Sequence, residues 1–197
     1  MSALICGSLA FDTITNFPGR FAQQILPDQV HILNVSFLVP TLRREFGGCA
    51  GNIAYTLRQL GGAPLVMAAV GADGEEYLQR LRSWDASTEH VRVVAETYTA
   101  QAIIITDADN NQITAFHPGA MQWAHLNAVP PATDIRVAII APDGREAMLK
   151  HADELAAASA VLLCCVAPPA GEPRLGRADA NRLGQHRTIG DSRRAGC

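Results

Sequence analysis

The sequence predicts an α/β fold, because short apolar segments alternate with amphipathic helical patterns along most of the chain. Ala3–Gly7 and Ala63–Gly71 are apolar runs that end in glycine, as buried strands do where a turn follows. The segments 52–60 and 75–84 instead place apolar residues three and four positions apart, which is the period of a helix. Strands and helices in this alternating order are typical of βαβ units, so we expect a mostly parallel sheet.

Asp12 lies just past the first predicted strand. Open α/β sheets bind their ligands at the carboxyl ends of the strands, and a carboxylate there can accept hydrogen bonds from sugar hydroxyls. Aspartate is also common in turns and caps, where its side chain bonds to nearby backbone, so a purely structural role stays open at this point.

A glycine-rich run opens the helix predicted over 52–60. Gly47, Gly48 and Gly51 fall within five positions, and glycine lets the backbone approach a ligand closely because it carries no Cβ. The N–H groups of the first helical turn would face such a ligand, and Asn52 adds an amide that can both donate and accept hydrogen bonds. The run predicts a pocket for a hydroxyl-rich small molecule, and the alternative is a glycine-rich turn that binds nothing.

The segment between Asp12 and the glycine-rich run predicts apolar strands outside the central sheet. Residues 18–27 are rich in loop formers. His31–Val39 carries β-branched and aromatic residues on both faces and stops at Pro40, which predicts a strand lying over another part of the fold. A further strand is predicted over Leu42–Phe46.

The second half of the chain continues the alternation. A short strand is predicted over His90–Val94, and a β-hairpin over 99–117, where the turn formers of 107–111 separate two strand-like runs. The remaining elements are predicted, in order, as a helical segment over 123–127, a strand over 137–141, a turn over 142–144, a helix over 145–157 and a strand over 161–166.

Composition excludes several classes of function. The chain has 197 residues, of which 48% are hydrophobic and 18% charged, which is ordinary for a soluble globular protein. The formal net charge of −3 gives no electrostatic case for binding nucleic acid or an anionic membrane. No apolar run approaches the ~20 residues needed to span a bilayer, and the N-terminus lacks the basic stretch of a secretory signal. We therefore expect a cytoplasmic protein that binds neither nucleic acid nor membrane.

The five cysteines form no C-x-x-C pair and have no histidines at zinc spacing, so no metal site is predicted. Their odd number and scattered positions suit reduced thiols in the cytoplasm. Cys49 lies inside the glycine-rich run. It is either a reactive thiol or, as such cysteines more often are, a small packed residue.

The apolar pattern stops after Val166. Residues 167–197 contain prolines, glycines and arginines but show no strand or helix period. Such a composition cannot bury enough apolar surface to offset the entropy of ordering, so we expect a disordered tail. A basic tail that binds an anionic partner is the alternative, which Glu172, Asp179 and Asp191 weaken by diluting the positive charge.

Taken together, these features resemble the ribokinase-like carbohydrate kinases of the PfkB family, which includes ribokinase, fructokinases and adenosine kinase. The resemblance runs from about Ala3 to Val166 and includes a Gly-x-Asp-Gly segment at 71–74, in which the second glycine falls early. The Gly-Gly-Cys-Ala-Gly-Asn form of the glycine-rich run is most similar to that of the nucleoside, adenosine kinase-like members. The matching features are, in order, Asp12, the apolar strands after it, Gly47-Gly48-x-x-Gly51-Asn52 and His117-Pro118-Gly119-Ala120 after the hairpin.

The resemblance implies a partial Rossmann-like ribokinase fold, an α/β/α domain with a small β lid over the substrate. Residues 1–166 would form the substrate-binding part, with lid strands at about 13–46 and 99–117. The family activity is ATP-dependent transfer of a phosphoryl group, with Mg²⁺, to a hydroxyl of a sugar or nucleoside. A substrate of the adenosine or ribose type is implied.

The resemblance also implies roles for individual residues. Asp12 would bind sugar hydroxyls, Gly47 and Gly48 would let the substrate lie against the backbone, and Asn52 would hydrogen-bond it. In the lid, an apolar base would meet Ile32, Val35 and Phe37.

The chain departs from the family at its catalytic motif. The family's catalytic base is an aspartate in a Gly-Ala-Gly-Asp motif, whose helix N-terminus forms the anion hole near bound ATP. The sequence has no such motif, and Gly190-Asp191 is not preceded by Gly-Ala. We therefore assign no catalytic residue and no ATP site, and we interpret the change after Val166 as a frameshift or premature end.

Two further interpretations remain at the level of sequence. The chain could be a non-catalytic fragment that binds a sugar or nucleoside, or that associates through its lid strands, for example as a homodimer. A dinucleotide-binding oxidoreductase is disfavoured, because the first strand is followed by Gly7-Ser8-Leu9-Ala10, which lacks the G-x-G-x-x-G spacing.

Overall fold

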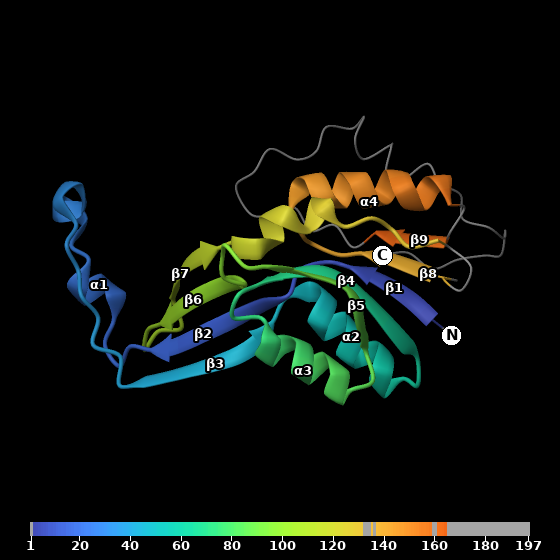
Figure 1. Cartoon of the computed structure of the whole chain (residues 1–197). Helices are drawn as coiled ribbons and strands as arrows, with labels where there is room; N and C mark the ends of the chain where they lie inside the picture. Colours follow the sequence, from blue (N-terminus) through green and yellow to red (C-terminus); the bar gives the residue numbers. More distant parts are fainter. Residues whose placement is uncertain (1, 132–134, 136, 159–160, 165–197) are drawn as a thin grey trace, which may run out of the picture.

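The structure, a computed structural model, describes residues 2–131, 135, 137–158 and 161–164 (Figure 1). Within these residues the strands form two sheets. One sheet has five strands in the order β5-β4-β1-β8-β9, and the other has four in the order β3-β2-β6-β7. The five strands of the first sheet are β1 (Ser2–Cys6), β4 (Ala63–Gly71), β5 (Ser87–Val94), β8 (Val137–Ile140) and β9 (Val161–Cys164).

Every pairing in the five-stranded sheet is parallel, as the alternating sequence pattern predicts. Helices α2 (Cys49–Gln59) and α3 (Glu75–Ser83) cover one face of this sheet. Helix α4 (Arg145–Ala157) and the 3₁₀ helix η2 (Gly119–Leu126) cover the other. Alternate residues of a strand point to opposite faces, so Ile5 packs in the α2/α3 core while its neighbour Leu4 packs in the core beneath α4. The α/β fold class is confirmed.

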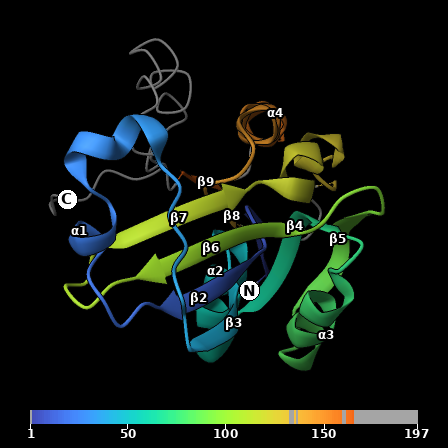
Figure 2. The same cartoon turned by 90° about the vertical axis from the view of Figure 1, so that its left-hand side faces the viewer.

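The four-stranded sheet extends from the edge of the first sheet where β1 ends (Figure 1). Its central pair, β2 with β6, is parallel, and the outer pairs β2–β3 and β6–β7 are antiparallel. Figure 2 shows these strands side by side, with the hairpin β6–β7 crossing in front of the first sheet. They are β2 (Ala10–Asn16), β3 (Thr41–Gly47), β6 (Ala100–Thr106) and β7 (Gln112–His117).

The strand predicted over His31–Val39 is wrong. The segment between β2 and β3 contains a short helix α1 (Phe21–Gln24) and a 3₁₀ helix η1 (Pro27–Ile32), and residues 33–39 pair with no strand. β-branched and aromatic residues favour a strand only where a neighbouring strand receives them. Here Phe37 packs against other aromatic rings, Phe17 at 5.0 Å and Phe21 at 5.1 Å between ring centroids.

This segment is tied to the β6–β7 turn through Asp107. The carboxylate of Asp107 accepts hydrogen bonds from the backbone N–H groups of Phe21, Asp109 and Asn111. These bonds, together with one from the Asn111 side-chain amide, lower the pKa of Asp107. Turn formers at 107–111 thus do more than reverse the chain, because one of them also fixes the start of α1.

Several element boundaries differ from the predicted ones. Helix α2 begins at Cys49 rather than Asn52, and the helical segment predicted over 123–127 is part of a longer 3₁₀ helix. Asp12 lies inside β2 and not in a turn after β1. The tail predicted over 167–197 lies outside the described residues, and no helix in the described part is long and apolar enough to cross a membrane.

Candidate functional site

Asp12 and Gly47 meet where β2 and β3 approach α2. Asp12 is half-buried on β2, and Gly47 ends β3, two residues before the helix begins. A Cβ on Gly47 would come within 2.7 Å of the Asp12 Cγ and closer still to its Oδ2. Glycine is therefore needed at position 47 for the Asp12 carboxylate to take this place.

The Asp12 carboxylate is prepared to accept hydrogen bonds. Its partial burial raises its pKa above the ordinary value, which reflects the loss of water around the charged form. Within the described residues no hydrogen bond or ion pair to this carboxylate is found. Hydroxyl groups of a ligand would restore the lost hydrogen bonds, so the geometry suits a hydroxyl-rich molecule.

The loop between β3 and α2 is held from below by Tyr77 of α3. Its hydroxyl donates a short hydrogen bond to the Gly47 carbonyl, and its ring packs against Phe11 and Phe46 at 5.5 and 5.1 Å. Burial, with the nearby Asp12 charge, raises the pKa of Tyr77 above its ordinary range, so the phenol stays protonated. The same contact accounts for glycine at position 51, because a Cβ there would collide with the Tyr77 hydroxyl.

Ser8 binds the N-terminus of α2. The Cys49 N–H donates to the Ser8 Oγ at 3.2 Å, and the Ala50 N–H donates to the Ser8 carbonyl at 3.0 Å. The expectation that free N–H groups of the first helical turn face a ligand is therefore wrong for these two donors. Gly48 makes the sharp entry possible, since its φ of +86° is strained for any residue with a Cβ.

Asn52 lies in the first turn of α2 and is exposed. Its carbonyl accepts a hydrogen bond from the Thr56 hydroxyl, while no hydrogen bond to its side-chain amide is found among the described residues. The amide is thus available to a ligand. The predicted roles of Asp12, Gly47, Gly48 and Asn52 in binding stay predictions, but the structure brings all four to one end of α2.

The predicted lid residues lie elsewhere in this conformation. The segment that carries Ile32, Val35 and Phe37 extends beyond the far end of β2, whereas Asp12 lies near the start of that strand (Figure 1). Ile32 is 76% exposed, and Phe37 packs within its own aromatic cluster. Their contact with a ligand therefore stays a prediction, which requires the segment to move toward Asp12.

Asp143 comes to the same region and was predicted only as part of a turn. It follows β8, and its neighbour Pro142 accepts a hydrogen bond from the Ser8 N–H at 3.1 Å. Its Oδ1 accepts a bond from the Gly144 N–H, but its Oδ2 is buried without a partner among the described residues. Burial raises the pKa of Asp143 to about 7. In the sequence, the signal for Asp143 is its position just after a predicted buried strand.

A metal site is not found in the described part of the chain, where no group of three or more His, Cys, Asp or Glu side chains could hold an ion. Asp73, from the Gly-x-Asp-Gly segment, has a structural use. It accepts a hydrogen bond from the Thr99 N–H at 2.7 Å and pairs with Arg44 at 3.5 Å, which joins α3, β3 and the start of β6.

Comparison with known proteins identifies the family. The profile of the pfkB family carbohydrate kinases matches residues 19–183, which is most of the chain. The chain belongs to the PfkB family of carbohydrate kinases. The match covers the segment between β2 and β3, the glycine-rich run and the hairpin, and it continues beyond Val166 into residues outside the described part.

Nucleoside kinases are among the similar proteins. The chain is 33% identical over 137 residues to a nucleoside kinase of Methanothermobacter thermautotrophicus, covering 68% of this chain and 41% of that protein. The solved nucleoside kinase of Burkholderia thailandensis in complex with inosine is 53% identical, with a TM-score of 0.71 over 82% of this chain and 51% of that one. The solved nucleoside kinase of Methanocaldococcus jannaschii, an archaeal member of the ribokinase family, gives 27% identity and a TM-score of 0.75, over 94% and 58%.

These likenesses confirm the partial ribokinase-like fold and place the chain among relatives of the nucleoside branch. The chain spans about two-fifths of the curated relative and about half of the solved ones, so the activity of the whole relatives does not transfer to it directly.

Replacing Tyr77 by phenylalanine should destabilise the chain by about 1–3 kcal/mol, because the Gly47 carbonyl would be left buried without its donor. Urea unfolding of the Tyr77→Phe variant measures the change. Tyr55→Phe is the matched control, since Tyr55 is 45% exposed and should change stability by no more than about 0.5 kcal/mol. Equal effects of the two substitutions would show that the Tyr77 hydroxyl bond contributes nothing.

Asp143 should make stability depend on pH between about 4 and 7. Its pKa is raised to about 7 in the folded chain, so the folded state holds a proton that the unfolded state releases near its ordinary pKa of 3.8. The free energy of unfolding is therefore highest at low pH and falls as pH rises toward 7. The total fall is about 1.4 kcal/mol for each unit by which folding raises the Asp143 pKa. Asp143→Asn should remove this loss, which urea unfolding at pH 5 and pH 8 measures. A variant whose stability falls as much as that of the parent chain would contradict the assignment.

Proposed function

We propose that this chain forms the nucleoside-binding part of a PfkB-family kinase. The ribose hydroxyls bind the Asp12 carboxylate, and the sugar lies against the backbone of Gly47 and Gly48. The Asn52 amide supplies a further hydrogen bond. The observation that carries the proposal is the Asp12 carboxylate, which lies where a Cβ on residue 47 would displace it and lacks a hydrogen-bond partner within the described residues.

The substrate class rests on the character of the site and on the relatives. The half-buried carboxylate of Asp12 and the exposed amide of Asn52, in the first turn of α2, suit the vicinal hydroxyls of a ribose, which present donors and acceptors side by side. The solved Burkholderia protein, with its 53% identity, binds inosine. A purine nucleoside is therefore proposed here, and closure of the segment carrying Ile32, Val35 and Phe37 would cover the base.

Phosphoryl transfer by the complete enzyme would use ATP and Mg²⁺, as the family does. Transfer depends on positioning and on stabilisation of charge at the phosphoryl group. The described residues contribute the acceptor side, namely the groups that hold the sugar. No described residue is assigned to ATP, to Mg²⁺ or to the catalytic base.

A binding protein without catalysis is the second candidate. It requires only the groups proposed to hold the sugar, namely Asp12, Gly47, Gly48 and Asn52. In either case we propose a cytoplasmic location, which the odd number and scattered positions of the five cysteines support.

Calorimetric titration of the 197-residue chain with inosine and adenosine tests the binding proposal. Asp12→Asn should weaken binding by about tenfold or more, because hydrogen bonds to a charged acceptor contribute ~1.5–3 kcal/mol. The control is Asp153→Asn, an exposed change on α4 that should leave binding unchanged. Failure of the parent chain to bind either nucleoside, or equal binding by the Asp12 variant, would contradict the proposal.

The same preparation mixed with ATP, Mg²⁺ and inosine separates the two candidates. Nucleoside-dependent release of ADP that disappears in Asp12→Asn would establish a kinase. Tight binding without ADP release would establish the non-catalytic protein.

We also propose that two copies of the chain associate through the four-stranded sheet. Strand β7 is exposed along its whole length and lies at the edge of the described sheet. Large apolar side chains are exposed on the hairpin, with Ile103 at 44%, Ile113 at 39% and Phe116 at 54%. An exposed apolar edge strand is a common site of association, and a second copy would cover it symmetrically.

Sedimentation analysis over a range of concentrations tests this association. The parent chain should sediment as a dimer, and Ile113→Lys should shift it to a monomer because a charge cannot be buried in an apolar contact without cost. Leu60→Lys is the control, since Leu60 is 81% exposed at the end of α2, away from the hairpin. A parent chain that stays monomeric at every concentration would contradict the proposal.

A further inference from the structure

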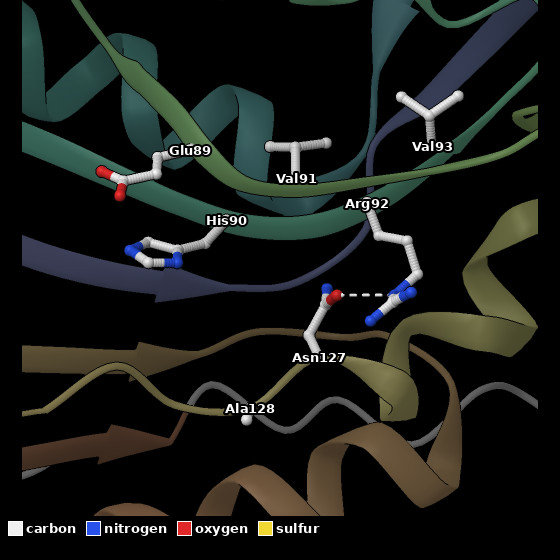
Figure 3. Close-up of a pocket in the computed structure, with 7 residues that line it drawn as sticks. All are labelled: Glu89, His90, Val91, Arg92, Val93, Asn127 and Ala128. Atoms are coloured by element: carbon white, nitrogen blue, oxygen red, sulfur yellow. Dashed lines mark hydrogen bonds between the residues drawn. The ribbon is translucent and has the colours of Figure 1, made fainter.

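An open cavity lies away from the Asp12 site, at the edge of the described five-stranded sheet. Its volume is about 390 Å³, which is within the range of small-molecule sites. It shares no residue with the candidate nucleoside site. Its lining consists of five consecutive residues of β5 and two that follow η2, namely Glu89, His90, Val91, Arg92, Val93, Asn127 and Ala128 (Figure 3).

Arg92 lines this cavity. The residue is exposed, and its guanidinium has no carboxylate partner among the described residues. Its Nε donates to the Asn127 Oδ1 at 3.0 Å, and its Nη2 donates to the Leu126 carbonyl at 2.9 Å. Both acceptors are neutral, so these two bonds orient the exposed side chain without adding a negative charge beside it. Among the described arginines, Arg44 and Arg58 in contrast pair with carboxylates at 2.9 and 2.7 Å.

The group that orients Arg92 is itself fixed. Asn127 is 8% exposed, its Nδ2 donates to the Ala68 carbonyl at 2.8 Å, and its own carbonyl accepts a bond from the Lys150 Nζ at 2.7 Å. The Asn127 amide cannot rotate without breaking the bond to β4. Arg92 therefore lies in a prepared position, which lowers the entropy lost when it binds a ligand.

One side of the Arg92 guanidinium has no protein partner among the described residues. In Figure 3 the Arg92 side chain reaches from β5 toward Asn127, whereas Val91 and Val93 point the other way. The Nη1 group takes part in no hydrogen bond among the described residues. His90 lines the same cavity and offers a ring N–H, and β5 lies at the end of the described sheet, so one of its backbone edges has no strand partner there.

We propose that this cavity binds a small oxyanion, a phosphate or carboxylate group carried by a small molecule. Two oxygens of such a group match the planar fork of the guanidinium, and the charge compensates that of Arg92. Glu89 also lines the cavity, and its carboxylate can accept a hydrogen bond from a donor on the same ligand. The ligand therefore carries its oxyanion at one end and a hydrogen-bond donor at the other.

Titration of the 197-residue chain with inorganic phosphate and with acetate, followed by amide NMR shifts, tests the site. Saturable shifts should concentrate at residues 89–93 and 127–128. The anion that binds with the higher affinity identifies the oxyanion as phosphate or carboxylate. Sodium chloride at equal ionic strength serves as the control for screening. Shifts that never saturate, or that fall elsewhere, would overturn the proposal.

Variants of Arg92 then test the group that binds. Arg92→Gln should weaken binding of the preferred anion by about tenfold or more. Arg92→Lys keeps the charge but not the planar fork, so its affinity should lie between those of the parent chain and the glutamine variant. Arg145→Gln removes an equal charge from an exposed position on α4 and should leave the affinity within about twofold. Circular dichroism confirms the fold of each variant. Equal losses of anion affinity in the Arg92 and Arg145 variants would show that the effect comes from net charge, and would overturn the proposed site.

Discussion

The contact between the Asp12 carboxylate and the Cα of Gly47 is the constraint on which the candidate site depends. It requires β2 and β3 to meet at the start of α2, and a side chain at position 47 would push the Asp12 carboxylate out of this place. The carboxylate loses water there without gaining a protein donor within the described residues, which raises its pKa. The hydroxyl groups of a polyol could supply the hydrogen-bond donors that this carboxylate lacks. The fold therefore favours the proposed ligand by placing the carboxylate here.

The surrounding structure holds this contact in place from two sides. Tyr77 fixes the Gly47 carbonyl from α3, and Ser8 fixes the first turn of α2 from the end of β1. Ser8 also donates to Pro142, so the loops after β1, β3 and β8 form one connected edge. Parallel sheets bring the ends of distant strands together in this way, and function concentrates at such an edge because the scaffold beneath it is rigid.

Periodicity in the sequence was sufficient for the central sheet, its covering helices and the hairpin, because each buries one face with a regular spacing. It failed at His31–Val39, where β-forming residues have no neighbouring strand and Phe37 instead packs on Phe17 and Phe21. It also could not assign Tyr77. The apolar stripe of α3 accounts for its burial, but the partner of its hydroxyl is 30 residues away. Asp12 and the glycines could be proposed as site residues from their residue types alone. Asp143 could not, because its buried, unpartnered Oδ2 is visible only in the fold.

The central claim, that Asp12 and the start of α2 hold a nucleoside, is tested most directly by amide NMR of the intact chain during titration with inosine. The account predicts saturable shifts that are largest at Asp12, Gly47, Gly48 and Asn52, with little change at the β5 cavity. The absence of saturable shifts at these four positions, or their appearance mainly at another surface, would contradict it.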